Sequence, residues 1–123
     1  MDINFLVKII NILYITDFMK LLFICTLNLQ RSPTAEKIFK DKYDTKSAGV
    51  ADTANVSLTK ELLEWADVVF VMEERHRKFI SEKFPKEYLE KKIINLDIPD
   101  MYYFMNEELV KDLTEKVETL IKT

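Results

Sequence analysis

The sequence predicts an α/β fold in which four parallel strands form one sheet and helices cover both of its faces. Short apolar runs of strand length recur along the chain, and segments of helical period separate them. A helix-length connection returns the chain to the start of the sheet, so consecutive strands are expected to run parallel through right-handed crossovers. With 123 residues, 48% of them hydrophobic, the chain is long enough for one such domain and too short for two.

Four segments are expected to form the strands. In chain order they are 20–25 (KLLFIC), 44–49 (DTKSAG), 67–72 (DVVFVM) and 92–96 (KIINL). The first and third are continuously apolar, as is usual for strands buried on both faces. The second is the weakest, and it ends at Gly49, the only glycine of the chain.

The helices are expected at 32–43, 58–66, 73–84 and 106–122, with one further turn at 86–91. Ser32 is the expected N-cap of the first helix, with Pro33 at its first helical position. Ser57 or Thr59 is expected to cap the second, and Pro85 to end the third.

Residues 1–18 form an apolar N-terminal extension that is short for a membrane span and carries Lys8 and Asp17. Asp2 replaces the cationic start of a secretory signal, and no small-residue cleavage site follows. Met19 stands directly before the first strand and is a candidate for the true start. The alternatives are an extra packed helix or an amphipathic anchor. We therefore assign the folded domain to 19–123 and expect no stable membrane insertion.

Composition excludes several classes of function. The net charge of −3 and the sequence pI of about 5.3 give no basic field that would recruit nucleic acid. One cysteine excludes an internal disulfide, so we expect a cytoplasmic protein. One cysteine and one histidine are too few for a thiolate zinc site, and we expect neither metal nor cofactor.

The stretch LLFICTLNLQRSPTAE (21–36) places that cysteine, Cys25, at the end of the first strand, with Arg31 six residues later at a helix start. Ligands of such sheets bind beyond the carboxyl ends of the strands. Backbone N–H groups and the helix dipole would form an anion cradle there. It would comprise Thr26, Leu27, Asn28, Leu29, Gln30 and Ser32. The cradle stabilises a thiolate, and an arginine fork holds two phosphate oxygens. The spacing therefore suits attack by sulfur on phosphorus. The alternative is that Cys25 is only a small buried hydrophobe.

Two carboxylates, Asp97 and Asp100, follow the last strand and should lie at the same edge as Cys25. Either one is a candidate general acid, although such residues are often only turn caps. We prefer Asp100 because Tyr102 and Tyr103 follow it and could line a slot for an aromatic substrate. Two other residues invite no role in the chemistry: His76 is expected to be solvated on a charged helix face, and Trp65 to lie in the core.

The motif Cys-x5-Arg-Ser-Pro followed by Ala-Glu resembles that of the low-molecular-weight protein tyrosine phosphatases. The resemblance continues in the same order over about residues 20–120. It includes SAG (47–49), LT (58–59), ADVVFVMEE (66–74) and DMYY (100–103), where the family commonly has Asp-Pro-Tyr-Tyr. The shortened middle is similar to a compact bacterial branch.

The resemblance implies a three-layer, flavodoxin-like sheet with strand order 2-1-3-4. It implies that Cys25 is the nucleophile, Arg31 the phosphate clamp and Asp100 the general acid and base. Ser32 would stabilise the thiolate, and Asn28 would hold the loop in shape, since asparagine tolerates left-handed backbone angles and this loop has no glycine. Ser47 matches the serine that bonds this asparagine, or merely ends its strand.

Four features depart from the family pattern, and one is that the stretch before Leu58 lacks the histidine with which some members brace the loop asparagine. Leu27 stands where many members have glycine, and Met101 replaces the usual proline after the acid. Gln30 replaces a second loop cysteine, so a protective disulfide with Cys25 cannot form. None of these changes removes a group that the chemistry requires.

We therefore expect a phosphomonoesterase that acts on a tyrosine-phosphorylated protein or a small aryl phosphate, as a monomer or weak dimer. Three alternatives stay open. An arsenate-reductase-like protein of the thioredoxin-coupled type would need further cysteines. A phosphocysteine carrier domain would not need Arg31. A phosphotyrosine-binding module with a degraded acid loop would bind without turnover.

Overall fold

The computed structural model describes residues 2–6 and 19–122. Residues 2–6 are exposed and include one helical turn. The three alternatives for residues 1–18 were sequence upstream of a start at Met19, an extra packed helix and an amphipathic anchor. Of these residues, 1 and 7–18 lie outside the described part of the chain. None of the helices among the described residues is long and apolar enough to cross a membrane.

Four parallel strands form the sheet, in the order β2-β1-β3-β4, which confirms the predicted topology. They are β1 (Lys20–Cys25), β2 (Asp44–Gly49), β3 (Val68–Val71) and β4 (Lys92–Asn95). The register between β1 and the edge strand β2 places Cys25 opposite Gly49, so the last residues of β1 and β2 lie side by side.

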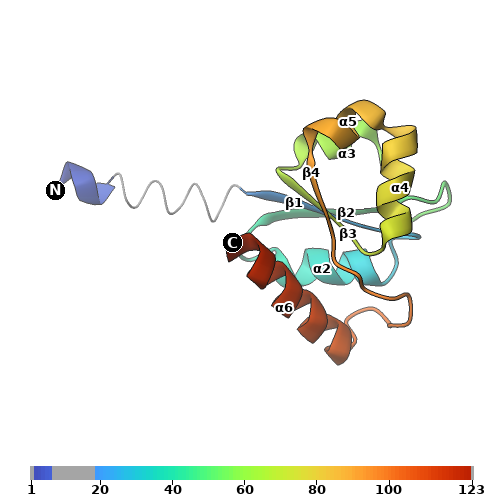
Figure 1. Cartoon of the computed structure of the whole chain (residues 1–123). Coiled ribbons are helices and arrows are strands. Elements are labelled where there is room, and N and C mark those ends of the chain that lie inside the picture. The colour runs from blue at the N-terminus through green and yellow to red at the C-terminus, as the bar shows by residue number, and fades with distance from the viewer. Residues whose placement is uncertain (1, 7–18, 123) are drawn as a thin grey trace.

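Five helices are described around this sheet: α2 (Arg31–Phe39), α3 (Lys60–Trp65), α4 (Glu74–Lys83), α5 (Pro85–Glu90) and α6 (Glu107–Lys122). Helices α2 and α6 cover one face, and α3, α4 and α5 cover the other (Figure 1). The order of strands and helices along the chain is the predicted one.

Alternate residues of β1 pack into two separate cores, because successive side chains of a strand point to opposite faces of the sheet. Leu21, Phe23 and Cys25 face α2 and α6, where the Phe23 ring stacks on that of Phe39 at 5.8 Å. Leu22 and Ile24 face the opposite layer. A strand buried on both faces explains why its sequence is continuously apolar.

Two details of the predicted helix starts change. Helix α2 begins at Arg31 rather than after a Ser32 N-cap, because the Ser32 hydroxyl bonds to the cysteine sulfur instead. Pro33 is thus the third helical residue, which the helix tolerates because N–H groups of the first turn have no intrahelical acceptor. For α3, Thr59 is the N-cap and accepts from the Leu62 N–H.

Candidate active site

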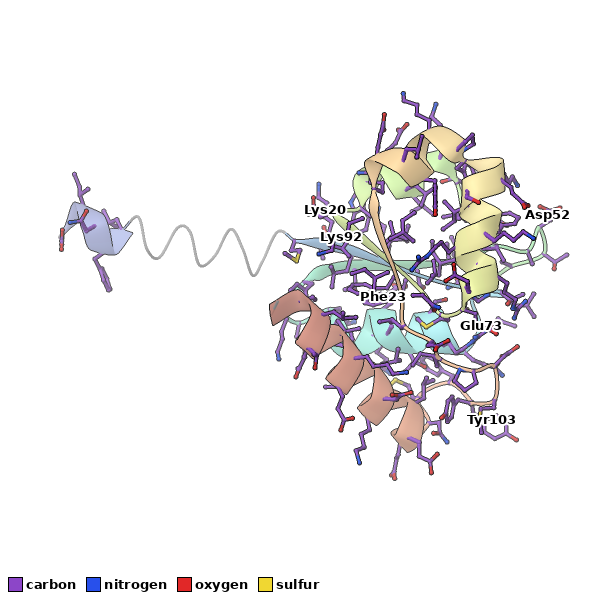
Figure 2. The ribbon with its side chains drawn as sticks, viewed as in Figure 1. Lys20, Phe23, Asp52, Glu73, Lys92 and Tyr103 are labelled. Atoms are coloured by element: carbon purple, nitrogen blue, oxygen red, sulfur yellow. The ribbon has the colours of Figure 1, made fainter. Side chains whose placement is uncertain are left out.

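A cavity of about 140 Å³ lies at the carboxyl ends of the strands. In Figure 2, Lys20 and Lys92 mark the starts of β1 and β4 at one edge, and Glu73 lies at the opposite edge, where the cavity is. The cavity is lined by Cys25, Thr26, Leu27, Leu29, Gln30, Arg31 and Asp100. The fold therefore brings both halves of the Cys-x5-Arg motif and the preferred acid to one place.

The loop from Cys25 to Arg31 takes its shape from Asn28 and from its neighbour Gly49. Asn28 has a φ of 57°, in the left-handed region that asparagine tolerates better than most residues. Its side chain is buried and fastened by hydrogen bonds. At Gly49, a Cβ atom would lie 2.5 Å from the Thr26 carbonyl oxygen and 3.0 Å from the Asn28 nitrogen. The only glycine of the chain thus stands where β2 closely approaches the loop.

A chain of hydrogen bonds connects the Glu36 carboxylate to the Cys25 sulfur. Ser47 donates to the Glu36 carboxylate and accepts from the Asn28 amide at 2.8 Å. The same amide donates to the Ser32 oxygen at 2.9 Å. The Ser32 hydroxyl lies 2.9 Å from the Cys25 sulfur and 3.4 Å from the Ala48 carbonyl oxygen, so its one proton can go to either acceptor. Glu36 is a member of this network that sequence reasoning missed.

Arg31 is 2% exposed, and its guanidinium is oriented by two acceptors. Its Nη1 donates to the Glu73 carboxylate at 2.6 Å and to the Ile98 carbonyl at 2.8 Å. These two bonds occupy both hydrogens of Nη1. The Nε and Nη2 hydrogens remain for a ligand, and they form the planar edge that matches two oxygens of a phosphate.

Glu73 links the two arginines at the cavity and was also missed by sequence reasoning. Its Oε2 accepts from Arg31 and, at 2.9 Å, from Arg75. Burial raises the pKa of Glu73, but hydrogen bonds from Arg75 and Arg31 outweigh it and lower the pKa to about 2. The carboxylate is therefore ionised at neutral pH. The signal for it was its position two residues beyond the end of the buried strand β3, at the same edge as Cys25.

His76 is fully buried, so the expectation that it is solvated was wrong. The Nδ1 atom accepts from the Glu73 N–H at 3.1 Å in a capping box that starts α4. The Nε2 atom lies 2.9 Å from the Thr26 hydroxyl. Burial, then the charges of Arg31 and Arg75, lowers the pKa of His76 to about 4. The ring is neutral at pH 7, although charged residues surround it in the sequence.

The two candidate acids lie differently. Asp100 lines the cavity, is 55% exposed, and has Oδ1 3.8 Å from Arg31 Nη2. Asp97 is not among the cavity residues; its backbone N–H bonds to Asn95 and its carbonyl accepts from a lysine of α6. The geometry favours Asp100 for proton transfer. Of the two tyrosines, Tyr102 packs against the core and Tyr103 is exposed on the loop (Figure 2).

Among the described residues, no group of three or more histidine, cysteine, aspartate or glutamate side chains could hold a metal ion. The cavity instead places the Arg31 guanidinium, the Thr26 hydroxyl and the Asp100 carboxyl group around a space beside the Cys25 sulfur. Such a site can bind an anion and present a nucleophile to it.

Comparisons were made with family models, with curated proteins and with solved structures. No family model matches the chain. A protein-arginine-phosphatase of Bacillus subtilis (strain 168) is 33% identical over 95 residues, covering 54% of this chain and 63% of that protein, so the match spans less than two thirds of the relative.

Solved structures match over more of the chain. The tyrosine phosphatase Wzb from Escherichia coli K30, in complex with phosphate, has a TM-score of 0.66 and 25% identity, covering 85% of this chain and 97% of that one. A low-molecular-weight protein tyrosine phosphatase from T. tengcongensis has a TM-score of 0.63 and 26% identity, covering 85% and 98%. These findings confirm the resemblance inferred from the motifs.

Proposed function

We propose that this chain, which resembles the low-molecular-weight protein tyrosine phosphatases in motif and in fold, hydrolyses phosphomonoesters through a cysteinyl-phosphate intermediate. The observation that carries the proposal is the common cavity of Cys25, Arg31 and Asp100, in which Ser32 bonds to the sulfur. A binding module would need the anion cradle but neither the nucleophile nor the acid.

In the first step, the Cys25 thiolate attacks phosphorus while the loop N–H groups and the free edge of Arg31 hold the equatorial oxygens. Negative charge that develops on these oxygens meets donors that are already oriented, and this lowers the barrier. Asp100, in its protonated form, gives its proton to the leaving oxygen as the ester bond breaks.

In the second step, the Asp100 carboxylate takes a proton from water, and the oxygen of that water attacks the phosphocysteine. The S–P bond breaks, the electron pair returns to sulfur as thiolate, and inorganic phosphate leaves. Asp100 is again protonated and ready for the next substrate.

The substrate that the site favours is phosphotyrosine of a protein. Two exposed apolar side chains, Leu27 and Leu29, line the cavity, and Met101 and Tyr103 are exposed on the loop that follows Asp100. A phenyl ring would bury apolar area against them. Phosphoarginine is the second candidate, because the curated relative is a protein-arginine phosphatase. The guanidinium of a phosphoarginine substrate would pair with a carboxylate near the phosphate, and Asp100 is the carboxylate that lines the cavity.

Turnover of para-nitrophenyl phosphate by the wild-type protein and by Cys25→Ser tests the reaction. We expect the serine variant to be inactive yet folded, because its hydroxyl lacks an adjacent base while the loop and Arg31 still bind phosphate. Activity of Cys25→Ser near the wild-type level would contradict the mechanism. Matched phosphotyrosine and phosphoarginine peptides then decide the substrate class by their kcat/KM ratio.

A further inference from the structure

The pair of Thr26 and His76 joins the loop of the nucleophile to the start of α4. The two residues are 50 positions apart in the sequence, and the bond between them is 2.9 Å long. The His76 ring is fully buried, and Thr26 lines the cavity beside the sulfur. A buried ring whose two nitrogens both form hydrogen bonds has a fixed orientation, so the His76 ring can hold the Thr26 hydroxyl in place.

The hydrogen bonds determine which tautomer His76 adopts. The Glu73 backbone N–H can only donate, so His76 Nδ1 must be the acceptor and carries no proton. The proton of the neutral ring is therefore on Nε2, and Nε2 donates to the Thr26 oxygen. This removes the freedom of Thr26 to donate toward the ring. The Thr26 hydroxyl proton must find another acceptor.

We propose that the Thr26 hydroxyl donates a hydrogen bond to the bound phosphoryl group, and that His76 is the positioning residue that keeps this hydroxyl turned toward the cavity. The inference rests on the proposed function of the site. It adds a side-chain donor to a cradle that otherwise consists of backbone N–H groups and Arg31. Ser32 is held in a comparable way: its hydroxyl accepts from the Asn28 amide and lies within hydrogen-bond distance of the Cys25 sulfur.

Binding of inorganic phosphate, measured by calorimetry, tests the contact without requiring turnover. Thr26→Val keeps the shape and removes the hydroxyl. We expect it to weaken phosphate binding by about 10-fold or more, the usual cost of a lost hydrogen bond to a charged group. Thr26→Ser should restore binding to within about threefold. Thr114→Val is the control, because Thr114 bonds only within α6.

Two substitutions of His76 separate its two bonds. In His76→Asn, the amide oxygen still accepts from the Glu73 N–H, as a capping box requires, but no donor reaches Thr26. In His76→Gln, the longer side chain can place an amide N–H near the former Nε2. We expect similar melting temperatures for both variants, weaker phosphate binding for His76→Asn by about three- to tenfold, and near-normal binding for His76→Gln.

A double-mutant cycle completes the test. If His76 acts through Thr26, adding His76→Asn to Thr26→Val causes no further loss of phosphate binding. Multiplicative losses would overturn the positioning role, and wild-type phosphate binding by Thr26→Val would overturn the hydroxyl contact. A wild-type protein that binds phosphate but turns over no ester would instead contradict the proposed function.

Discussion

At the scale of single residues, the site depends on polar side chains that are almost fully buried. Asn28, Arg31, Ser32 and His76 are each at most 2% exposed, and each has a hydrogen-bond partner. Removing one partner of a buried pair leaves the other unsatisfied, which costs more than the bond itself contributed. Substitutions here should therefore affect catalysis and stability together.

Arg31→Lys should be nearly as damaging as Arg31→Ala. A lysine cannot present two parallel N–H groups to the phosphate while also bonding Glu73 and the Ile98 carbonyl. We expect kcat to fall on the order of 10²-fold or more, measured with an aryl phosphate. Arg77→Lys is the control, because Arg77 lies on α4, does not line the cavity and pairs with Glu74. A mild loss in Arg31→Lys would show that the guanidinium does not hold the phosphate.

Asp100→Ala should reveal the acid through its dependence on the leaving group. A basic phenolate needs a proton to depart, whereas a stable phenolate leaves without one. We expect a loss of roughly 10²–10⁴-fold with phenyl phosphate and a much smaller loss with para-nitrophenyl phosphate.

Asp97→Ala is the matched control for this substitution, and it should show little dependence on the leaving group. The reverse pattern would exchange the roles of the two aspartates. If neither variant shows the dependence, the loop supplies no acid, and a binding function gains support.

At the scale of elements, the loop after β1 is held between the end of β2 and the starts of α2 and α4. The backbone of β2 continues past Gly49 with hydrogen bonds to the loop: the Val50 N–H donates to the Cys25 carbonyl and the Ala51 N–H to the Thr26 carbonyl. The close contact at Gly49 makes these bonds possible. The geometry of the nucleophile thus depends on a neighbouring strand.

Gly49→Ala should damage the site through backbone displacement. The new Cβ would lie 2.5 Å from the Thr26 carbonyl oxygen and 2.7 Å from the Ala54 Cβ. We expect a loss of about 1–3 kcal/mol in the free energy of unfolding, from denaturant titration, and a lower kcat. Adding Ala54→Gly relieves only the side-chain contact, so the double variant should stay impaired. Full recovery would show that the loop backbone is not displaced.

At the scale of the whole molecule, the sheet separates two cores, and a cluster of charged groups lies at its carboxyl edge. Two groups at this edge have shifted pKa values: Glu73, lowered to about 2, and His76, lowered to about 4. Since these pKa values differ from those of the unfolded chain, the stability of the whole protein depends on pH.

Lowering the pH below about 6.5 should destabilise the protein through His76. The pKa of His76 is about 4 in the fold against a reference value of 6.5, so the unfolded chain binds the proton first. The free energy of unfolding should fall by up to roughly 1.4 kcal/mol per pH unit until about pH 4. The contribution of Glu73 is present above its reference pKa of 4.5 and is lost toward about pH 2.

Denaturant titrations at several pH values check this expectation. The His76→Asn variant should lose the dependence between about pH 6 and 5, since His76 is the only histidine of the chain. An unchanged slope in that variant would assign the dependence to other groups.

The sequence by itself determined the strands, their order along the chain and the loop that carries Cys25 and Arg31, because these follow from local patterns of burial, capping and spacing. Strand order in the sheet came from the family resemblance, and the structure has the same order. Only the tertiary structure revealed Glu73 and His76 at the site. Their partners Arg31 and Thr26 lie 42 and 50 positions away. Within EERHRK both residues look like part of a solvated helix face. Whether a charged or imidazole side chain is solvated or buried depends on what packs over it, and contacts at that separation leave no periodic trace in the sequence.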